Sequence, residues 1–347
     1  MLTYSFILPI YNCSEYLRDC IDSIMNIGLE SMEIILIDDG SVDNSSELCD
    51  QLALTSRSIK VCHQKNRGAS TARNIGIEIA EGERIVFVDG DDTIDSPLAR
   101  KIFTKEELNK DADLVISGFV FEYFRQGKVY RKDERVYPKR GILEPSEWHQ
   151  EFLQLYKTNY LSPVWSKVFK RKIIIDNSIR FNSKLISYED LDFTVKYLSC
   201  CGNISIYDLP IYKYRQSEDE GNSIRRLTKV SDLSQLVGSI EESLELLIEK
   251  QGMDDSPKKI LFSLYSSLSR DKISISSRQQ ILEICKGFKK WYYSHVENID
   301  QLDVYTRYML NEQINMIMIR RRYLKIRHGL AVIIKSVRST VIGTLSK

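Results

Sequence analysis

Short apolar runs and amphipathic stretches alternate along the first third of the chain. The apolar runs cover residues 4–10, 33–38, 59–64, 84–89 and 112–124. Between the first four runs, apolar side chains recur at helical spacing over residues 13–25, 45–54 and 68–80. Strands that are apolar throughout and alternate with helices are typical of a parallel sheet covered on both faces. The pattern therefore predicts an α/β domain.

From residue 122 onward the pattern changes. Aromatic and charged residues alternate over 122–141, which predicts an exposed hairpin or lid. A helix is predicted over residues 187–202, with Ser187 as its N-cap. Residues 203–215 have the pattern of two short strands broken at Pro210. This part of the chain therefore predicts a second, less regular half of the same domain.

The chain after residue 227 is helical in pattern to its end. Its last acidic residue is Glu312, and residues 313–347 carry eight Lys and Arg side chains interleaved with aliphatic ones. Such a basic amphipathic tail fits a helix that lies on an anionic membrane surface. The alternative is a solvated basic helix that packs on the domain.

Composition narrows the class of protein. The 347 residues are 43% hydrophobic, enough for a large core, and the formal net charge of +1 selects no polyanionic partner, so nucleic acid is not predicted. The seven cysteines are odd in number and form no CxxC pair, which suggests neither a disulfide framework nor a zinc site. The apolar N-terminus has the pattern of a first strand, and no run of 18 apolar residues predicts a membrane span.

Two acidic turns follow predicted strands. Asp38 and Asp39 end the second strand, and Asp89 and Asp91 flank Gly90 after the fourth. In parallel sheets, ligands bind at the carboxyl ends of the strands, so both turns are expected at one edge. We expect Asp38 to bind turn amides, while Asp39 could accept a hydrogen bond from a base or ribose.

Repulsion between Asp89 and Asp91 is tolerable if a divalent cation lies there. Their oxygen ligands suit Mg²⁺ or Mn²⁺, with positions left for water and phosphate, and Gly90 lets the backbone approach a ligand closely. The alternative is that these aspartates only form turns and caps. We expect that simpler role for Asp95 or Ser96, just before Pro97 at a helix start.

Other phosphate-binding and hydrolase motifs are missing from the sequence. There is no GxGxxG after the first strand, no GxxxxGK[ST] and no GxSxG. The four histidines, His63, His149, His295 and His328, lie far apart in sequence and are expected to be surface or packing residues. A dinucleotide fingerprint, a P-loop and a serine hydrolase are therefore not indicated.

Several segments together resemble family 2 glycosyltransferases with the GT-A fold. They are residues 5–24, 33–45, 66–92, 165–174 and 187–193, in order. The resemblance covers about residues 1–225 and is strongest to bacterial enzymes that build capsular or other surface polysaccharides. It implies a GT-A domain, a Rossmann-like nucleotide-binding sheet flanked by helices, over 1–226, with a nucleotide-sugar half (1–120) and an acceptor half (121–226). A mostly helical C-terminal region, 227–347, would follow.

The resemblance also implies a reaction, the inverting transfer of a sugar from a nucleoside diphosphate, usually UDP, to a hydroxyl. Pro9 and Tyr11 would lie along the base, Asp39 would contact uracil, and Arg73 would lie near the base or the diphosphate. The donor would be UDP-hexose or UDP-N-acetylhexosamine. The acceptor would be a growing, lipid-linked surface polysaccharide.

The metal and the base come from separate motifs of the family. Asp89 and Asp91 stand at its DxD positions, where Asp89 and Gly90 would face the donor and both aspartates would hold Mn²⁺ or Mg²⁺. Asp190 stands where the family keeps its catalytic base.

Three further residues, Glu189, Trp165 and Lys167, would line the acceptor side. Tyr214 and Arg215 resemble a loop that often folds over donor and acceptor. The enzyme would be a peripheral protein on the inner face of the cell membrane, in the cytoplasm, and could form a homo-oligomer.

Two other classes of protein stay open. A nucleotidyltransferase would use a similar sheet, but it would need a glycine-rich basic loop after the first strand, where this chain has residues 9–17 without glycine. A non-catalytic nucleotide-sugar-binding subunit would not need Asp89, Asp91 and Asp190 together. Turnover of UDP-sugars separates these alternatives.

Overall fold

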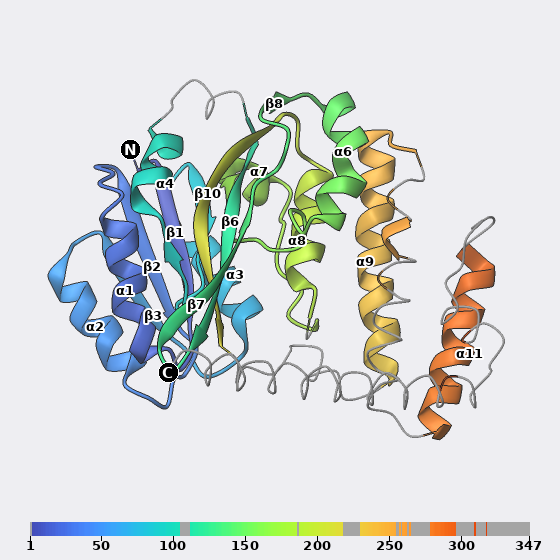
Figure 1. Cartoon of the computed structure of the whole chain (residues 1–347), viewed down its shortest axis with the longest axis horizontal. Coiled ribbons are helices and arrows are strands. Elements are labelled where there is room, and N and C mark those ends of the chain that lie inside the picture. The colour runs from blue at the N-terminus through green and yellow to red at the C-terminus, as the bar shows by residue number, and fades with distance from the viewer. Residues whose placement is uncertain are drawn as a thin grey trace, which may run out of the picture. The chain divides into compact units, whose positions relative to one another are not determined.

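A computed structural model of the chain describes residues 2–104, 112–185, 187–217, 230–254 and 278–295, together with residues 257, 259–261, 264, 309 and 317 (Figure 1). It divides into two compact units. One contains Met1–Ser223 and Gly238–Ile260, and the other Ile224–Val237 and Leu261–Lys347. The predicted boundary after residue 226 and nearly all of the basic tail 313–347 lie outside the described residues.

The first unit is built on one mixed sheet. Its strands are β1 (Tyr4–Ile10), β2 (Met32–Asp38), β3 (Ile59–His63), β4 (Arg84–Phe87), β5 (Thr93–Ile94), β6 (Leu114–Arg125), β7 (Lys128–Arg135), β8 (Gly141–Leu143), β9 (Lys167–Lys170) and β10 (Ile204–Ser217). Its helices are α1 (Ser14–Met25), α2 (Ser45–Thr55), α3 (Ala69–Ile79), α4 (Ser96–Phe103), α6 (Pro145–Lys157), α7 (Arg171–Asp176) and α8 (Glu189–Leu198). Helix α9 (Val230–Gln251) contributes its part from Gly238 onward, and α11 (Arg278–His295) belongs to the second unit.

The strand order is β3-β2-β1-β4-β9-β6-β10-β5, with β7 paired to β6 and β8 paired to β10. Strands β3, β2, β1 and β4 run parallel, as the alternating pattern predicts. Strand β9 is antiparallel to both of its neighbours, β4 and β6, and β10 runs parallel to β6. The short β9 is therefore what joins the two halves of the sheet.

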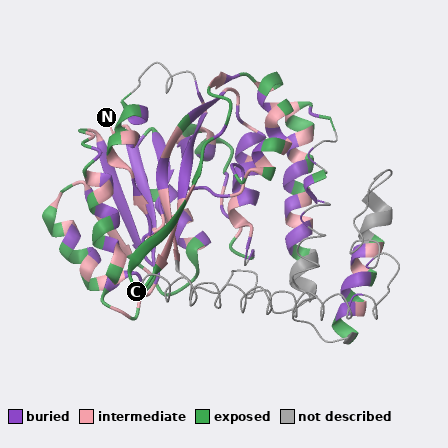
Figure 2. Ribbon diagram, viewed as in Figure 1, coloured by how far each residue is buried: buried purple, intermediate pink, exposed green. Residues whose placement is uncertain are grey.

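Strands β1, β2 and β4 are buried on both faces, which explains why their sequences are mostly apolar (Figure 2). Helix α3 packs so closely on β1 that a Cβ atom added at Gly76 would overlap Ile7 Cγ2. This close approach fixes the helix that carries Arg73 against the sheet.

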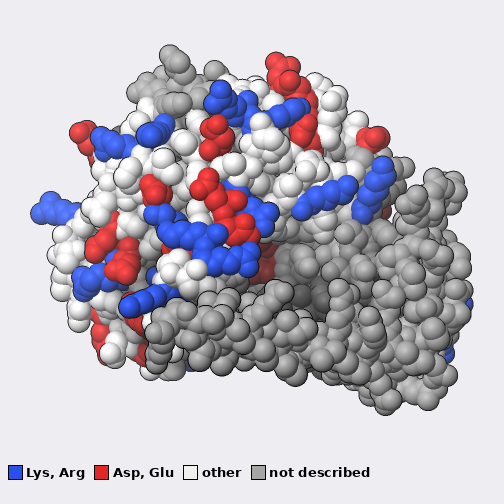
Figure 3. Space-filling view, in the orientation of Figure 1, with Lys and Arg blue, Asp and Glu red and all other residues white. Residues whose placement is uncertain are grey.

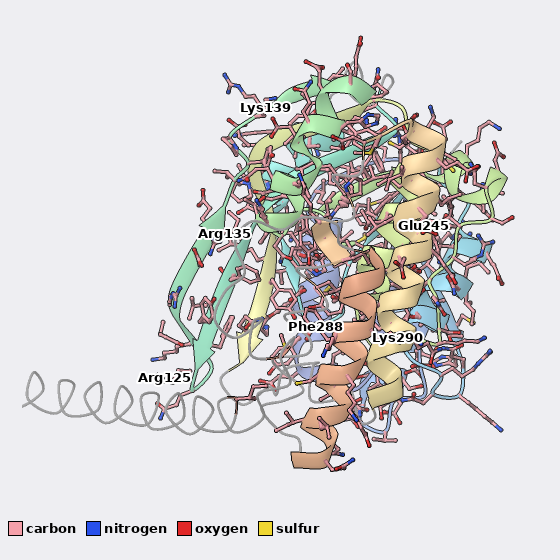
Figure 4. All side chains as sticks on the ribbon, turned by 90° about the vertical axis from the view of Figure 1, so that its right-hand side faces the viewer. Arg125, Arg135, Lys139, Glu245, Phe288 and Lys290 are labelled. Atoms are coloured by element: carbon pink, nitrogen blue, oxygen red, sulfur yellow. The ribbon has the colours of Figure 1, made fainter. Side chains whose placement is uncertain are left out.

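The predicted hairpin is confirmed as β6 and β7, which pair in an antiparallel register. Lys and Arg side chains mix with Asp and Glu on this face of the molecule (Figure 3). Lys132 bonds Glu122 at 2.6 Å and Arg135 bonds Asp133 at 2.7 Å, so these charges are paired within the hairpin. Figure 4 shows Arg125 at the hairpin tip and Arg135 further along β7.

Three local predictions have definite outcomes. Asp95, one of the two residues expected to cap, is the N-cap of α4 and accepts a hydrogen bond from Leu98 N at 3.2 Å. The predicted cap by Ser187 is wrong, because Tyr188, in the left-handed region at φ 61°, precedes the helix. The predicted pair of strands around Pro210 is one strand, β10, whose register shifts on either side of that proline.

Two further sequence expectations concern the chain as a whole. The seven cysteines form no disulfide bond in the structure. Within the described part of the chain, none of the helices combines the length and apolar character needed to cross a membrane.

Candidate functional site

The two acidic turns lie at one edge of the sheet, on either side of the end of β1. Ile10 of β1 pairs with Asp38 of β2, so these two strands end together, and β4 ends slightly earlier, where Phe87 pairs with Ile7 of β1. The turns stay attached to this edge, since Asp39 N donates to Ile10 O at 2.8 Å. The predicted placement of both turns at one edge is therefore confirmed.

Asp38 and Asp39 order the first turn and the entrance to α3. Ser41 N donates to Asp38 Oδ1 at 3.0 Å, and His63 Nδ1 lies 2.9 Å from Asp38 Oδ2. Burial alone would raise the pKa of Asp38, but these hydrogen bonds lower it below its ordinary value. Asp38 therefore has the structural role expected of it, and His63 supports that role.

Asp39 is only 3% exposed and already has several donors. Gln64 Nε2 and Arg67 N donate to Oδ1 at 2.6 and 2.7 Å, and Gly68 N donates to Oδ2 at 2.7 Å. Gly68 is the N-cap of α3, so Asp39 holds the loop that leads into that helix. A contact between Asp39 and uracil stays a prediction.

Arg73 of α3 joins three carboxylates. Its Nη2 donates to Asp89 Oδ1 at 2.8 Å, its Nη1 donates to Asp190 Oδ1 at 3.2 Å, and Nη1 lies 3.9 Å from Glu189 Oε1. Arg73 is buried, which disfavours its charge, but Asp190 and Asp89 hold its pKa above the ordinary value. Its guanidinium carbon also lies 5.4 Å from the centre of the Phe181 ring.

Asp190 lies in the first turn of α8 and keeps 21% of its side chain exposed. Val164 N donates to its second oxygen at 3.3 Å. Burial raises the pKa of Asp190 to about 7; Arg73 opposes the rise, and Glu189 and Asp89 add to it. A carboxylate with a pKa near neutrality and an exposed edge has the properties of a general base.

The second acidic turn is held by strand β10. Asp89 N donates to Tyr212 Oη at 3.1 Å, and Tyr212 Oη donates to Asp92 Oδ2 at 2.7 Å. Arg215 N donates to Asp92 Oδ1 at 2.7 Å. Asp92 is 1% exposed, so it supports the turn from inside the protein.

Gly90 packs closely against two side chains in this turn. A Cβ atom there would lie 2.8 Å from Ile10 Cδ1 and 2.9 Å from Cys13 Sγ. Arg215 Nε donates to Asp91 O at 3.1 Å, and its guanidinium lies over the Tyr16 ring at 4.4 Å. The backbone around Gly90 is thus fixed from two sides.

Sequence reasoning missed the support that Asp92, Tyr212 and Arg215 give to this turn. The only sequence signal was the third aspartate of the acidic run. Residues 218–229, which follow β10 and include the rest of the predicted loop over donor and acceptor, lie outside the described residues.

Trp165 and Lys167 lie behind the site, and neither faces its surface. Trp165 is buried and stacks on Tyr212 with ring centres 4.7 Å apart and planes at 10°. Lys167 is 2% exposed and donates to Pro163 O. Burial lowers the pKa of Lys167 to about 7, and the Asp190 carboxylate opposes this shift.

The predicted base-binding residues lie where β1 ends. Pro9 is within β1 and Tyr11 directly follows it. Tyr11 is 50% exposed, so solvent and ligands can reach it.

Asp89 and Asp91 could hold a hard cation. Among the described residues, no group of three or more His, Cys, Asp or Glu converges as a complete cage of ligands. Mg²⁺ is commonly bound by one or two carboxylates together with substrate phosphates and water. The two aspartates around Gly90 fit that mode of binding.

A cavity of about 1200 Å³ lies at the opposite edge of the sheet, where β1 and β4 begin. Tyr4, Arg84 and Arg171 are among the residues that line it. Arg73 and the carboxylates of Asp89 and Asp190 lie at the edge formed by the carboxyl ends of the strands. That edge is therefore the stronger candidate for an active site.

Comparison with solved structures agrees with this architecture. The chain superposes on TarS of S. aureus in complex with UDP-GlcNAc with a TM-score of 0.57 at 18% identity, covering 90% of this chain and 91% of that one. It also superposes on GalNAc-T7 with UDP, GalNAc and Mn²⁺ with a TM-score of 0.51 at 16% identity, covering 85% of this chain and 57% of that one. These likenesses show the GT-A-like fold.

Sequence comparison identifies the family. EpsJ of Bacillus subtilis (strain 168), described as an uncharacterized glycosyltransferase, is 30% identical over 218 residues, and the match spans 61% of each protein. The chain therefore spans about three-fifths of that relative's length. Residues 5–176, about half of the chain, match the family model for glycosyl transferase family 2. The predicted family and fold are thus confirmed, and the chain belongs to glycosyl transferase family 2.

Proposed function

We propose that the chain transfers a sugar from a nucleoside-diphosphate sugar to a hydroxyl of a bacterial surface polysaccharide or teichoic acid. The observation that carries the proposal is the arrangement around Arg73, which joins Asp89 of the acidic turn to Asp190 of α8. The family match and the UDP-GlcNAc bound by TarS support a UDP-sugar as the donor.

The donor would lie along the carboxyl edge of the sheet. Its base would pack on Tyr11, and its diphosphate would face the turn around Gly90. Asp89 and Asp91 would hold Mn²⁺ or Mg²⁺ there, in keeping with the Mn²⁺ present with GalNAc-T7. The cation would stabilise negative charge on the departing diphosphate by several kcal/mol. Tyr212 and Asp92 would keep the turn in place while the diphosphate binds and leaves.

Asp190 would act as the base. It would take the proton from the acceptor hydroxyl as that oxygen attacks the anomeric carbon, which contributes roughly 10²–10⁴-fold to the rate. Attack from the side opposite the diphosphate would invert the anomeric centre. Glu189, beside Asp190 and partly exposed, would line the acceptor pocket. Trp165 and Lys167, both buried, would support that pocket from behind.

The acceptor would be lipid-linked, and the basic tail 313–347 would hold the enzyme at an anionic membrane surface. Attraction of about 1 kcal/mol for each basic residue near such a surface would suffice. Deletion of residues 313–347 would then release the protein from anionic vesicles in flotation. Equal flotation of the full and shortened chains would refute this part of the proposal.

The function is tested with the purified chain, a panel of UDP-sugars and Mn²⁺. We expect UDP release from one donor, faster when a surface-polysaccharide acceptor is present. Release of pyrophosphate from a nucleoside triphosphate and a sugar phosphate would identify a nucleotidyltransferase instead. Binding of UDP-sugars without any turnover would identify a non-catalytic subunit.

A further inference from the structure

Helix α8 carries a second aspartate whose environment differs from that of Asp190. Asp192 is fully buried and accepts hydrogen bonds from Ser243 Oγ at 2.6 Å and Ser239 Oγ at 3.3 Å. Lys196, one turn further along α8, donates to its other oxygen at 2.7 Å. A buried carboxylate is stable only with such partners, so these donors fix the direction in which Asp192 points.

Asp190 and Asp192 point to nearly opposite sides of α8. Residues two positions apart in an α-helix, such as 190 and 192, are separated by about 200° of rotation about the helix axis. Asp190 faces Arg73 and Val164, while Asp192 faces the two serines of α9. A rotation of α8 that moved Asp190 away from Arg73 would also pull Asp192 away from Ser243.

Helix α9 holds α8 at its other end as well. Gln251 Nε2 donates to Leu198 O and Cys201 O, both at 2.9 Å. These carbonyls lie at the C-terminal end of α8, where helix carbonyls lack partners within the helix. Figure 4 shows α9 in front of α8, with Glu245, an exposed residue, on α9. The contacts near Asp192 and at Leu198 together fix both the rotation and the axial position of α8.

The segment that leads into α8 is attached to the same helix. Asn182 Nδ2 donates to Ser239 Oγ at 3.1 Å, and that hydroxyl in turn donates to Asp192. Ser239 therefore connects α9 to α8 and to the chain just before it.

We propose that Asp192 is a positioning residue, and that α9, which lies outside the family match at residues 5–176, serves to aim Asp190 at the acceptor hydroxyl. The inference rests on the proposed function, because it assigns Asp190 the role of base. Asp192 itself is too deeply buried to reach a substrate. It acts through the orientation of α8.

The test compares two substitutions at one position. Asp192→Leu is close in size but cannot accept a hydrogen bond. Ser243 Oγ can still donate to Ser239 O at 3.0 Å, while Ser239 Oγ and Lys196 lose their acceptor. Asp192→Asn keeps an oxygen that Ser243 can reach, while Lys196, which is 31% exposed, can turn to solvent. Leu52 is a buried residue of α2, and Leu52→Ala is the control for a loss of stability alone.

We expect Asp192→Leu to lower kcat for transfer by about 10²-fold, the size of effect that a 1 Å misplacement of a reacting group produces. The Kd for UDP and the KM for the donor would stay within a few-fold of wild type, because α8 meets the donor side through Arg73, which keeps its bond to Asp89. Donor hydrolysis by water would fall less than transfer. Asp192→Asn would keep transfer within a few-fold of wild type, and Leu52→Ala would lose stability with unchanged kcat.

Hydrogen exchange gives a measurement that does not need turnover. In Asp192→Leu, amides of residues 189–198 would exchange faster, and in Asp192→Asn they would not. If Asp192→Leu does not fold, Ser243→Ala, which removes the shortest of these bonds, is measured in the same way. Wild-type kcat in Asp192→Leu, even together with a loss of stability like that of Leu52→Ala, would overturn the proposal. Failure of the proposed function would show differently, as absence of UDP release in the wild type with the exchange pattern intact.

Discussion

The guanidinium of Arg73 lies 3.2 Å from Asp190 Oδ1, a contact that joins α3 to α8 across 117 positions of the chain. The other end of the same guanidinium binds Asp89. Arg73 is held from the side by Phe181, whose backbone exchanges two hydrogen bonds of 2.9 Å with the amide of Asn74. One buried cation thus links the carboxylate expected to bind metal to the carboxylate expected to act as base.

Removing Arg73 should affect stability and activity together. Arg73→Ala leaves Asp89, Glu189 and Asp190 without their shared cation, and breaking a buried ion pair in this way costs about 3–5 kcal/mol in the free energy of unfolding. Arg73→Lys keeps the charge but loses the planar fork that reaches two carboxylates, so it should lose less stability.

Both Arg73 variants are expected to lose transfer by about 10²-fold or more. Urea unfolding and transfer rates measure the two effects, and Arg57→Ala, at an exposed arginine of the same half, is the control. Wild-type transfer by Arg73→Lys would show that bidentate contact is not needed.

The raised pKa of Asp190 predicts the pH dependence of transfer. A base must be deprotonated to accept a proton, and the pKa of Asp190 is about 7. The value of kcat/KM should therefore fall as pH drops below about 7, approaching tenfold for each pH unit, and level off above it. A plateau that continued to pH 5 would exclude Asp190 as the base.

The substitution Asp190→Asn tests the same assignment without a change of pH. It should retain UDP binding and lose transfer by roughly 10²-fold or more. Transfer within a few-fold of wild type would contradict the role of base.

Metal dependence can be tested at the turn around Gly90. Asp91→Ala should abolish transfer while the melting temperature stays close to that of wild type, since Asp91 lies in a turn at the edge of the sheet. EDTA should stop wild-type turnover, and Mn²⁺ or Mg²⁺ should restore it. Full activity of the wild type in excess EDTA would show that no divalent cation takes part.

Local sequence patterns predicted much of this arrangement. The apolar runs located β1, β2 and β4, and their common ends placed Asp39 and Asp89 at one edge of the sheet. The alternation of aromatic and charged residues located the β6–β7 hairpin. Each of these predictions rests on the periodicity of a short segment or on the end of a strand, and both can be recognised from residues that are neighbours in the sequence.

Long-range contacts were beyond such reasoning. The support of Asp92 by Tyr212 spans 120 positions, and nothing in either local sequence specifies the other. The burial of Trp165 depends on its stacking against Tyr212, which requires β9 and β10 to be in place. The start of α8 was misjudged because Tyr188 adopts a left-handed conformation that the sequence does not favour.

Two helical glycines provide a last, internally controlled prediction about α3. Alanine is favoured over glycine within a helix by about 1 kcal/mol, so Gly→Ala stabilises a helix where space allows. At Gly238 of α9 a Cβ atom would meet nothing within 4 Å, and Gly238→Ala should raise stability by up to about 1 kcal/mol. At Gly76 the same atom would overlap Ile7 Cγ2 and lie 3.3 Å from Ile7 Cβ, and such overpacking typically costs about 1–3 kcal/mol.

Gly76→Ala should therefore lower stability despite its better helix propensity. It should also lower transfer by more than its stability loss explains, because Gly76 lies one turn after Arg73 and a shift of α3 away from β1 moves that guanidinium relative to Asp190. Chemical unfolding and transfer rates of both glycine variants are the measurements. Equal stabilisation by both alanines would show that α3 can move away from Ile7 without consequence, and the tight packing of α3 on β1 would then not be what holds Arg73 in place.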